Sequence, residues 1–96
     1  MRNNIYYLLD FHKKCIQIIG YGDFIINKYC EYVNLLLDDY LTDNEQKQLK
    51  LHNFNYDLIY KFAFGDVDDI SFDGIDKNKL DDFFDKISFI DVEEFY

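Results

Sequence analysis

Proline and tryptophan are missing from this chain of 96 residues, and its longest uninterrupted aliphatic run covers only residues 35–37. A helix that crosses a bilayer needs about 20 predominantly apolar residues in succession, so the sequence excludes a transmembrane helix. Asp10 interrupts the N-terminal region, which therefore lacks the apolar segment typical of a secretory signal. From these absences we expect a soluble, cytoplasmic protein that does not bind a membrane.

Basic residues are also scarce. Ten Lys and Arg stand against 19 Asp and Glu, which gives a net charge of −9. A surface of this sign repels nucleic acid and anionic membranes, so we expect no direct contact with nucleic acid. Residues 66–96 hold eleven acidic residues and three lysines, a balance of −8, whereas residues 1–65 hold eight acidic and seven basic residues, a balance of −1. The sequence therefore predicts an acidic C-terminal module on a nearly neutral base.

Cysteine is rare, since Cys15 and Cys30 are the only two. Without an export signal we expect both to be reduced and buried as small apolar residues. His12 and His52 complete the ligand types of a zinc site, but the spacing fits no zinc-finger pattern. The same residues lack the oxyanion hole and the third group of a nucleophilic site. We therefore expect no metal, no cofactor and no enzymatic activity.

One loop partly matches a calcium-binding motif. Asp69, Ser71, Asp73 and Gly74 stand at positions 1, 3, 5 and 6 of a calcium loop. Leu80 then stands at position 12, where the motif needs a bidentate carboxylate. A chain with 15 Asp meets the first part of this pattern by chance, so calcium binding is the weakest functional alternative.

Apolar and aromatic side chains are plentiful, at 49% and 20% of the chain. They suffice for one core, and a chain of this size forms a single domain, residues 1–96. Helical periodicity predicts a mainly α bundle of four to five short helices, near residues 4–19, 23–41, 43–51, 55–64 and 76–87. Two points stay open: a short β-hairpin near 67–76, which Asp73-Gly74 would turn, and a strand or a helical turn for 88–96.

The same periodicity predicts which helix faces are buried. In the first helix the predicted core stripe is Ile5, Leu8, Leu9, Cys15, Ile16 and Ile19. In the second helix it is Ile26, Cys30, Val33, Leu37 and Leu41. In the last helix Leu80, Phe83, Phe84 and Ile87 are predicted to face the core, and Asp81, Asp82 and Asp85 to face water.

Helix ends carry local signals as well. Gly20 is expected to end the first helix in a left-handed conformation. The predicted N-caps are Asp23, Asn55 and Asp76, together with a capping box of Thr42 and Glu45.

The acidic module favours a binding function. We interpret the chain as a non-enzymatic inhibitor whose carboxylates occupy a basic, nucleic-acid-binding groove on a partner protein. The predicted partner-binding residues are Asp66, Asp68, Asp69, Asp73, Asp76, Asp81, Asp82, Asp85, Asp91, Glu93 and Glu94. In size, charge and composition the chain is similar to phage-encoded anti-CRISPR and anti-restriction DNA mimics and to immunity proteins of nuclease toxins, although the similarity covers no motif. A bias typical of low-GC genomes, with 11 Ile and 8 Asn against one Ala and one Arg, favours a phage or mobile element acting in the host cytoplasm.

Other interpretations remain. The chain is also typical of a helical protein-interaction domain whose acidity serves only solubility. Tyrosine is enriched at the energetic centres of protein interfaces, and the candidates for an aromatic interface are Tyr6, Tyr7, Tyr21, Tyr32 and Tyr56. The small polar face of the second helix leaves a homodimer open as well.

Overall fold

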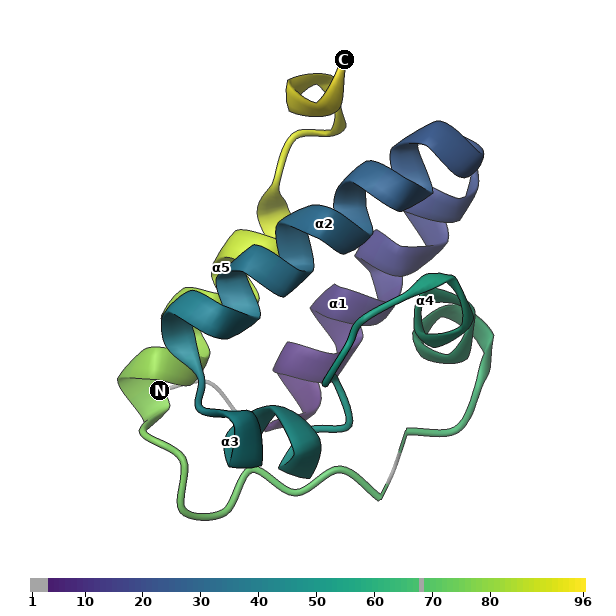
Figure 1. Cartoon of the computed structure of the whole chain (residues 1–96). Coiled ribbons are helices and arrows are strands. Elements are labelled where there is room, and N and C mark those ends of the chain that lie inside the picture. The colour runs from purple at the N-terminus through teal and green to yellow at the C-terminus, as the bar shows by residue number, and fades with distance from the viewer. Residues whose placement is uncertain (1–3, 68) are drawn as a thin grey trace.

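The structure is a computed structural model that describes residues 4–67 and 69–96 (Figure 1). Its elements are α1 (Asn4–Ile19), α2 (Asp23–Tyr40), α3 (Asp43–Gln48), α4 (Tyr56–Phe64), α5 (Lys77–Phe89) and a short 3-10 helix, η1 (Val92–Phe95). This confirms the predicted mainly α fold. Of the two alternatives for residues 88–96, a strand or a helical turn, the structure shows the helical turn, η1. Asp68 and the side chain of Ile5 lie outside the described part of the chain.

The prediction of a possible β-hairpin near residues 67–76 is wrong, because the described residues there contain no strand. The carbonyl oxygens of Ser71 and Asp73 accept hydrogen bonds from the Gln48 side chain instead of from a neighbouring strand. The predicted turn itself is present. Gly74 occupies it with a φ of 79°, a conformation that glycine adopts at no steric cost.

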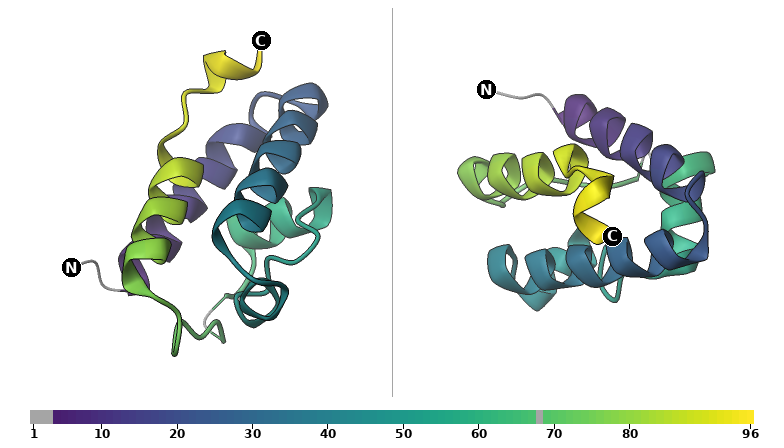
Figure 2. Two further views of the ribbon diagram at one scale, coloured as in Figure 1. Left: turned by 60° about the vertical axis from the view of Figure 1, so that its left-hand side comes forward. Right: turned by 90° about the horizontal axis from the view of Figure 1, so that it is seen from above.

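α1 and α2 are antiparallel (Figure 1), and α4 and α5 each contact both of them. Seen from above, α1 and α2 form two opposite sides, with α5 and α4 between them at opposite ends (Figure 2). η1 lies beyond the C-terminal end of α5 and contacts α2. Within the described residues, no helix combines the length and the apolar character needed to cross a bilayer.

The buried face of α1 differs from the predicted stripe. Tyr7, Phe11, Cys15 and Ile18 are at most 1% exposed, and only Cys15 was predicted among them. Leu9 and Ile16 are 43% and 42% exposed. The reason is that α1 carries apolar residues around most of its circumference, so periodicity alone does not select one face. Tyr7 and Phe11 fill the space between the helices, and Leu9 and Ile16 are left outside.

The core is rich in aromatic contacts. The Phe11 ring lies 5.8 Å from the Phe54 ring, 4.9 Å from Phe62 and 6.2 Å from Phe84, measured between ring centroids. It thereby joins α1 to α4, to α5 and to the loop before α4. The predicted stripes of α2 and α5 are buried as expected, because each is flanked by charged residues that define the opposite face.

Most of the predicted helix caps are confirmed. The Thr42 hydroxyl accepts from the Glu45 amide at 3.2 Å and the Glu45 carboxylate from the Thr42 amide at 2.9 Å, which closes the capping box. Asn55 caps α4 by accepting from the Leu58 amide at 3.1 Å, and Asp76 caps α5 by accepting from the Asn78 amide at 2.7 Å.

α1 ends at Ile19, before Gly20, as predicted, but the predicted conformation of Gly20 and the predicted N-cap Asp23 are wrong. Gly22, with a φ of 91°, holds the left-handed position expected at Gly20, so the chain makes its sharp bend two residues later. Gly22 also stands at the N-cap of α2, and Asp23 is the first helical residue. The Asp23 carboxylate accepts the Tyr56 hydroxyl at 3.1 Å, which ties the start of α2 to α4.

The hydroxyl of Ser88 is buried on α5 and has no hydrogen-bond partner among the described residues. An unpaired buried hydroxyl destabilises the folded state, and alanine is also the better helix former. We therefore expect Ser88→Ala to raise the free energy of unfolding by about 1 kcal/mol in urea denaturation. Ser71→Ala is the control, because the exposed Ser71 hydroxyl accepts a hydrogen bond from the Asp73 amide. Its removal should not raise the free energy of unfolding. A loss of stability in Ser88→Ala would contradict the prediction.

Candidate functional site

The negative charge of the C-terminal segment is not spread evenly along it. Residues 66–76 hold five acidic residues and no basic one, and residues 90–96 hold three acidic residues and no basic one. α5 between them carries three Asp and three Lys and is neutral. In Figures 1 and 2 the two acidic segments lie at opposite ends of α5. We call them the acidic loop (66–76) and the acidic tail (90–96).

The acidic loop is held against α3 and the residues that follow it. Lys50 forms an ion pair with Asp69, which lowers the pKa of that carboxyl, and Gln48 Nε2 donates to the carbonyls of Ser71 at 3.0 Å and Asp73 at 2.7 Å. Among the side-chain oxygens of the calcium-like sequence, the Asp69 carboxylate is paired with a cation and the Ser71 hydroxyl accepts from the Asp73 amide at 3.3 Å. Phe72 and Ile75 of the loop are buried, so its exposed carboxylates sit on a fixed support.

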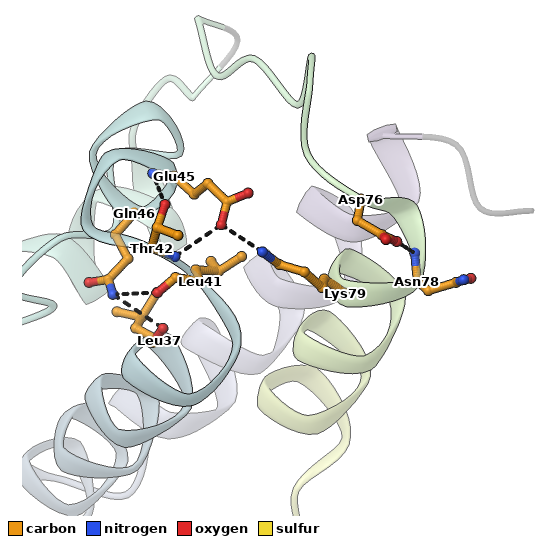
Figure 3. A network of polar contacts seen from close by, with 8 residues as sticks. All are labelled: Leu37, Leu41, Thr42, Glu45, Gln46, Asp76, Asn78 and Lys79. Carbon is orange, nitrogen blue, oxygen red and sulfur yellow. Dashed lines mark hydrogen bonds and ion pairs between the residues drawn. The ribbon is translucent and has the colours of Figure 1, made fainter.

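A polar network fixes the start of α5 against α3 (Figure 3). Lys79 Nζ lies 2.7 Å from Glu45 Oε1, the same carboxylate that completes the capping box of α3. The hydrogen bond from Lys79 lowers the pKa of the Glu45 carboxyl, with a further contribution from the Thr42 amide. The charge of one lysine of α5 is therefore paired with a carboxylate of α3.

The three aspartates of α5 do not behave alike. Asp82 and Asp85 are exposed, as predicted. Asp81 is half-buried and accepts a hydrogen bond from the hydroxyl of Tyr7 on α1, so the prediction that it faces water is wrong. Tyr7 is 1% exposed and is likewise no surface residue. The reason is that α5 lies beside α1, and the flank of α5 that carries Asp81 faces that helix.

The acidic tail is docked onto α2. Asp91 caps η1 by accepting from the Glu93 amide at 3.0 Å, Val92 is buried, and the Phe95 ring lies 5.8 Å from the Tyr32 ring. Glu93 and Glu94 are exposed. Burial, and then the charge of Glu94, raise the pKa of the Tyr32 hydroxyl.

The predicted acidic residues thus fall into groups. Asp69, Asp76, Asp81 and Asp91 are used within the fold, in an ion pair, two caps and the bond to Tyr7. Of the predicted acidic residues that the structure describes, only Asp81 is half-buried; Asp66, Asp73, Asp82, Asp85, Glu93 and Glu94 are exposed, and Asp66 and Asp85 also have an interaction within the fold. They come from the acidic loop, α5 and the acidic tail.

The tyrosines of the alternative interface lie on different elements. Tyr6, Tyr21 and Tyr56 are 56%, 49% and 41% exposed, on α1, in the turn after it and on α4. Tyr32 is half-buried and its hydroxyl donates to the Lys86 carbonyl at 3.1 Å. With Tyr7 buried, the five residues proposed together are not all surface residues.

The cysteines and His12 lie within the packed fold and form no ligand cluster with one another. Cys15 and Cys30 are buried free thiols, as predicted. Burial raises the pKa of Cys30 to about 11 and that of Cys15 further, so both stay protonated and poorly nucleophilic near neutral pH. His12 Nδ1 lies 2.9 Å from the Phe62 carbonyl oxygen. Across residues 4–67 and 69–96, no three His, Cys, Asp or Glu side chains are grouped so that they could hold a metal.

Gln46 is an important residue that the sequence analysis missed. It is 3% exposed, and its Nε2 lies 3.2 Å from the Leu37 carbonyl and 3.1 Å from the Leu41 carbonyl (Figure 3). The same nitrogen lies 3.3 Å from Asp38 Oδ1. The Leu37 carbonyl also accepts from the Leu41 amide at 2.9 Å, so Gln46 adds a second donor there, and it supplies a donor to the Leu41 carbonyl at the C-cap of α2. Only the closeness of Gln46 to the end of α2 hints at this role in the sequence.

Comparisons of the chain with protein-family models, with curated proteins and with solved structures gave no match.

Proposed function

We propose that this is a non-enzymatic binding protein whose exposed carboxylates occupy a basic, nucleic-acid-binding groove on a partner protein. The observation that carries the proposal is the placing of two acidic segments at the two ends of one helix, with Asp82 and Asp85 exposed between them. A partner that meets this side of the molecule encounters the acidic loop, then Asp82 and Asp85 with the exposed Lys86 beside them, and then the acidic tail.

The spacing suits a groove built for nucleic acid. A helix of 13 residues is about 20 Å long, since each residue adds 1.5 Å. Duplex DNA covers about six base pairs in that length and presents charge throughout, and its binding proteins gather Lys and Arg to match. The acidic loop, Asp82, Asp85 and the acidic tail offer carboxylates over a comparable distance.

α5 carries three lysines and three aspartates, but not all of the lysine charge is free to oppose a basic partner. Lys79 is engaged by Glu45 of α3, so its charge is compensated inside the protein. Nearby like charges are unfavourable in the free protein and are relieved when cations approach, so the association should be fast and should weaken steeply with salt. In function such a protein would act as a phage or mobile-element inhibitor of the anti-CRISPR or anti-restriction type.

A capture experiment tests the proposal. The protein is immobilised, a lysate of a low-GC bacterium is passed over it at low salt, and bound proteins are eluted with duplex DNA and identified by mass spectrometry. We expect DNA-binding proteins in the eluate, because duplex DNA competes for the same groove. The test variant neutralises Asp73, Asp82, Glu93 and Glu94 with Asn or Gln, four exposed residues whose loss leaves the caps intact. It should reduce the affinity for a captured protein by more than tenfold.

The matched control removes the same number of charges elsewhere. It replaces Glu31, Asp39, Asp43 and Asp57, which are exposed on α2, α3 and α4, by Gln or Asn. We expect it to keep most of the affinity. If duplex DNA elutes nothing, or if test and control variants lose affinity equally, the acidic surface along α5 is not the binding site.

A further inference from the structure

A cavity of about 220 Å³ lies where the acidic loop meets α1 and the start of α5. Its apolar lining comes from Tyr7, Phe72, Ile75 and Leu80, and its polar lining includes Asp73 and Lys77. Small-molecule sites usually occupy about 300 to 1,000 Å³, so this smaller cavity suits a single side chain of a partner better than a cofactor.

The Asp73 carboxylate has no partner among the described residues, which distinguishes it from the rest of the acidic loop. Asp69 is held in an ion pair, Asp76 caps α5, and Asp66 has an interaction within the fold. Asp73 is therefore the one described carboxylate of the loop that remains available to a cation from outside, and it borders the cavity.

The backbone around this carboxylate is fixed. The Asp73 carbonyl accepts from Gln48 Nε2 at 2.7 Å, and the Asp73 amide donates to the Ser71 hydroxyl at 3.3 Å. Phe72 and Ile75 on either side of the turn are buried. A ligand that meets Asp73 therefore pays little of the ordering cost that a mobile loop would add to binding.

The charge around the cavity favours a cation. The acidic loop holds five acidic residues and no basic one. Lys77 is the one basic residue named in the lining, and it already has an interaction within the fold. An anionic ligand would meet the repulsion of the loop, whereas a cationic side chain would meet the free carboxylate of Asp73.

We propose that this cavity receives one arginine side chain of the basic partner, an inference that rests on the function proposed above. The apolar lining contacts the methylene groups of the arginine, and the Asp73 carboxylate accepts two parallel N–H bonds from its guanidinium. A guanidinium is planar, weakly hydrated and able to pack against aromatic residues such as Tyr7 and Phe72, whereas the ammonium of lysine is compact and strongly hydrated. Grooves that bind nucleic acid use arginine to hold phosphate, so Asp73 takes the place of a phosphate here.

Titration of the isotope-labelled protein with N-acetyl-arginine-methylamide at low salt, followed by NMR, tests the proposal. We expect saturable shifts of the Gly74 and Ile75 amides, with a dissociation constant in the millimolar range. The citrulline analogue, which has nearly the same shape and no charge, should bind at least threefold more weakly, and so should the lysine analogue. Asp73→Asn should weaken the binding of the arginine probe at least threefold, because it removes the charge without removing a contact of the fold.

Asp82→Asn is the matched control, since Asp82 is exposed on α5 and is not part of the cavity lining. It should leave the affinity for the arginine probe within twofold of the parent value. The proposal is overturned if the Gly74 and Ile75 amides show no saturable shift, if the citrulline or lysine analogue binds equally well, or if Asp82→Asn weakens binding as much as Asp73→Asn. If the arginine probe fails while duplex DNA still elutes captured proteins, the arginine site is wrong and the binding function proposed above stands.

Discussion

Replacement of Gln46 by glutamate is expected to destabilise the protein by about 3 kcal/mol or more at neutral pH, as when a buried charge is left uncompensated. In the parent protein the amide nitrogen of Gln46 donates to the carbonyls of Leu37 and Leu41. Gln46→Glu replaces this donor with a carboxylate oxygen that faces those acceptors. The new charge would also lie at the C-terminal, negative end of α2 and beside the Asp38 carboxylate.

The loss should depend on pH in a defined direction. Burial and the neighbouring oxygens disfavour the charged form, so the introduced carboxyl has a folded-state pKa above its unfolded value of about 4.3. The penalty is then complete above the folded pKa, and it shrinks as the pH falls toward the unfolded pKa. The protonated acid also regains one donor for a carbonyl. Urea denaturation at pH 7 and at pH 4.5 should therefore show a clearly smaller gap between variant and parent at the lower pH.

Gln17→Glu is the matched control for this experiment. Gln17 is exposed on α1 and already accepts a hydrogen bond from Lys14, so the same change of charge should alter the stability by less than about 0.5 kcal/mol. If Gln46→Glu were as stable as the parent at pH 7, the amide of Gln46 would not be the cap of α2 that the structure describes.

Replacement of Phe11 by alanine should cost about 3 to 5 kcal/mol, the usual range for a large aromatic side chain removed from a core. Phe11 is 0% exposed and its ring contacts Phe54, Phe62 and Phe84. The change therefore opens a cavity where α1 meets α4 and α5. A domain of this size is stable by only about 5 to 15 kcal/mol, so much of the stability would be lost. Thermal and urea denaturation measure the effect.

Leu9→Ala is the informative comparison, since Leu9 lies two residues away on the same helix and is 43% exposed. This change should cost less than about 1 kcal/mol. If Leu9→Ala were the more damaging of the two, α1 would present the face predicted from periodicity and not the face seen in the structure.

Much of the candidate site could be anticipated because charge is a property of composition. The acidic segment, the exposed side chains of Asp82 and Asp85, and the caps at Asn55 and Asp76 all follow from residues within one turn of each other. The division of the charge into a loop and a tail around a neutral helix could also be counted along the chain. That the two segments lie at opposite ends of α5 needed the structure.

The sequence by itself determined the helices of this protein, the caps of α3, α4 and α5 and the buried faces of α2 and α5, because these depend on hydrogen bonds and periodicity between near neighbours. Only the tertiary structure decided which side of α1 is buried, since that helix is apolar on several sides and its neighbours select among them. It likewise paired Tyr7 with Asp81, which are 74 residues apart, and set Gln46 under the end of α2. Such contacts depend on how helices distant in the chain pack together, and no local pattern encodes that packing.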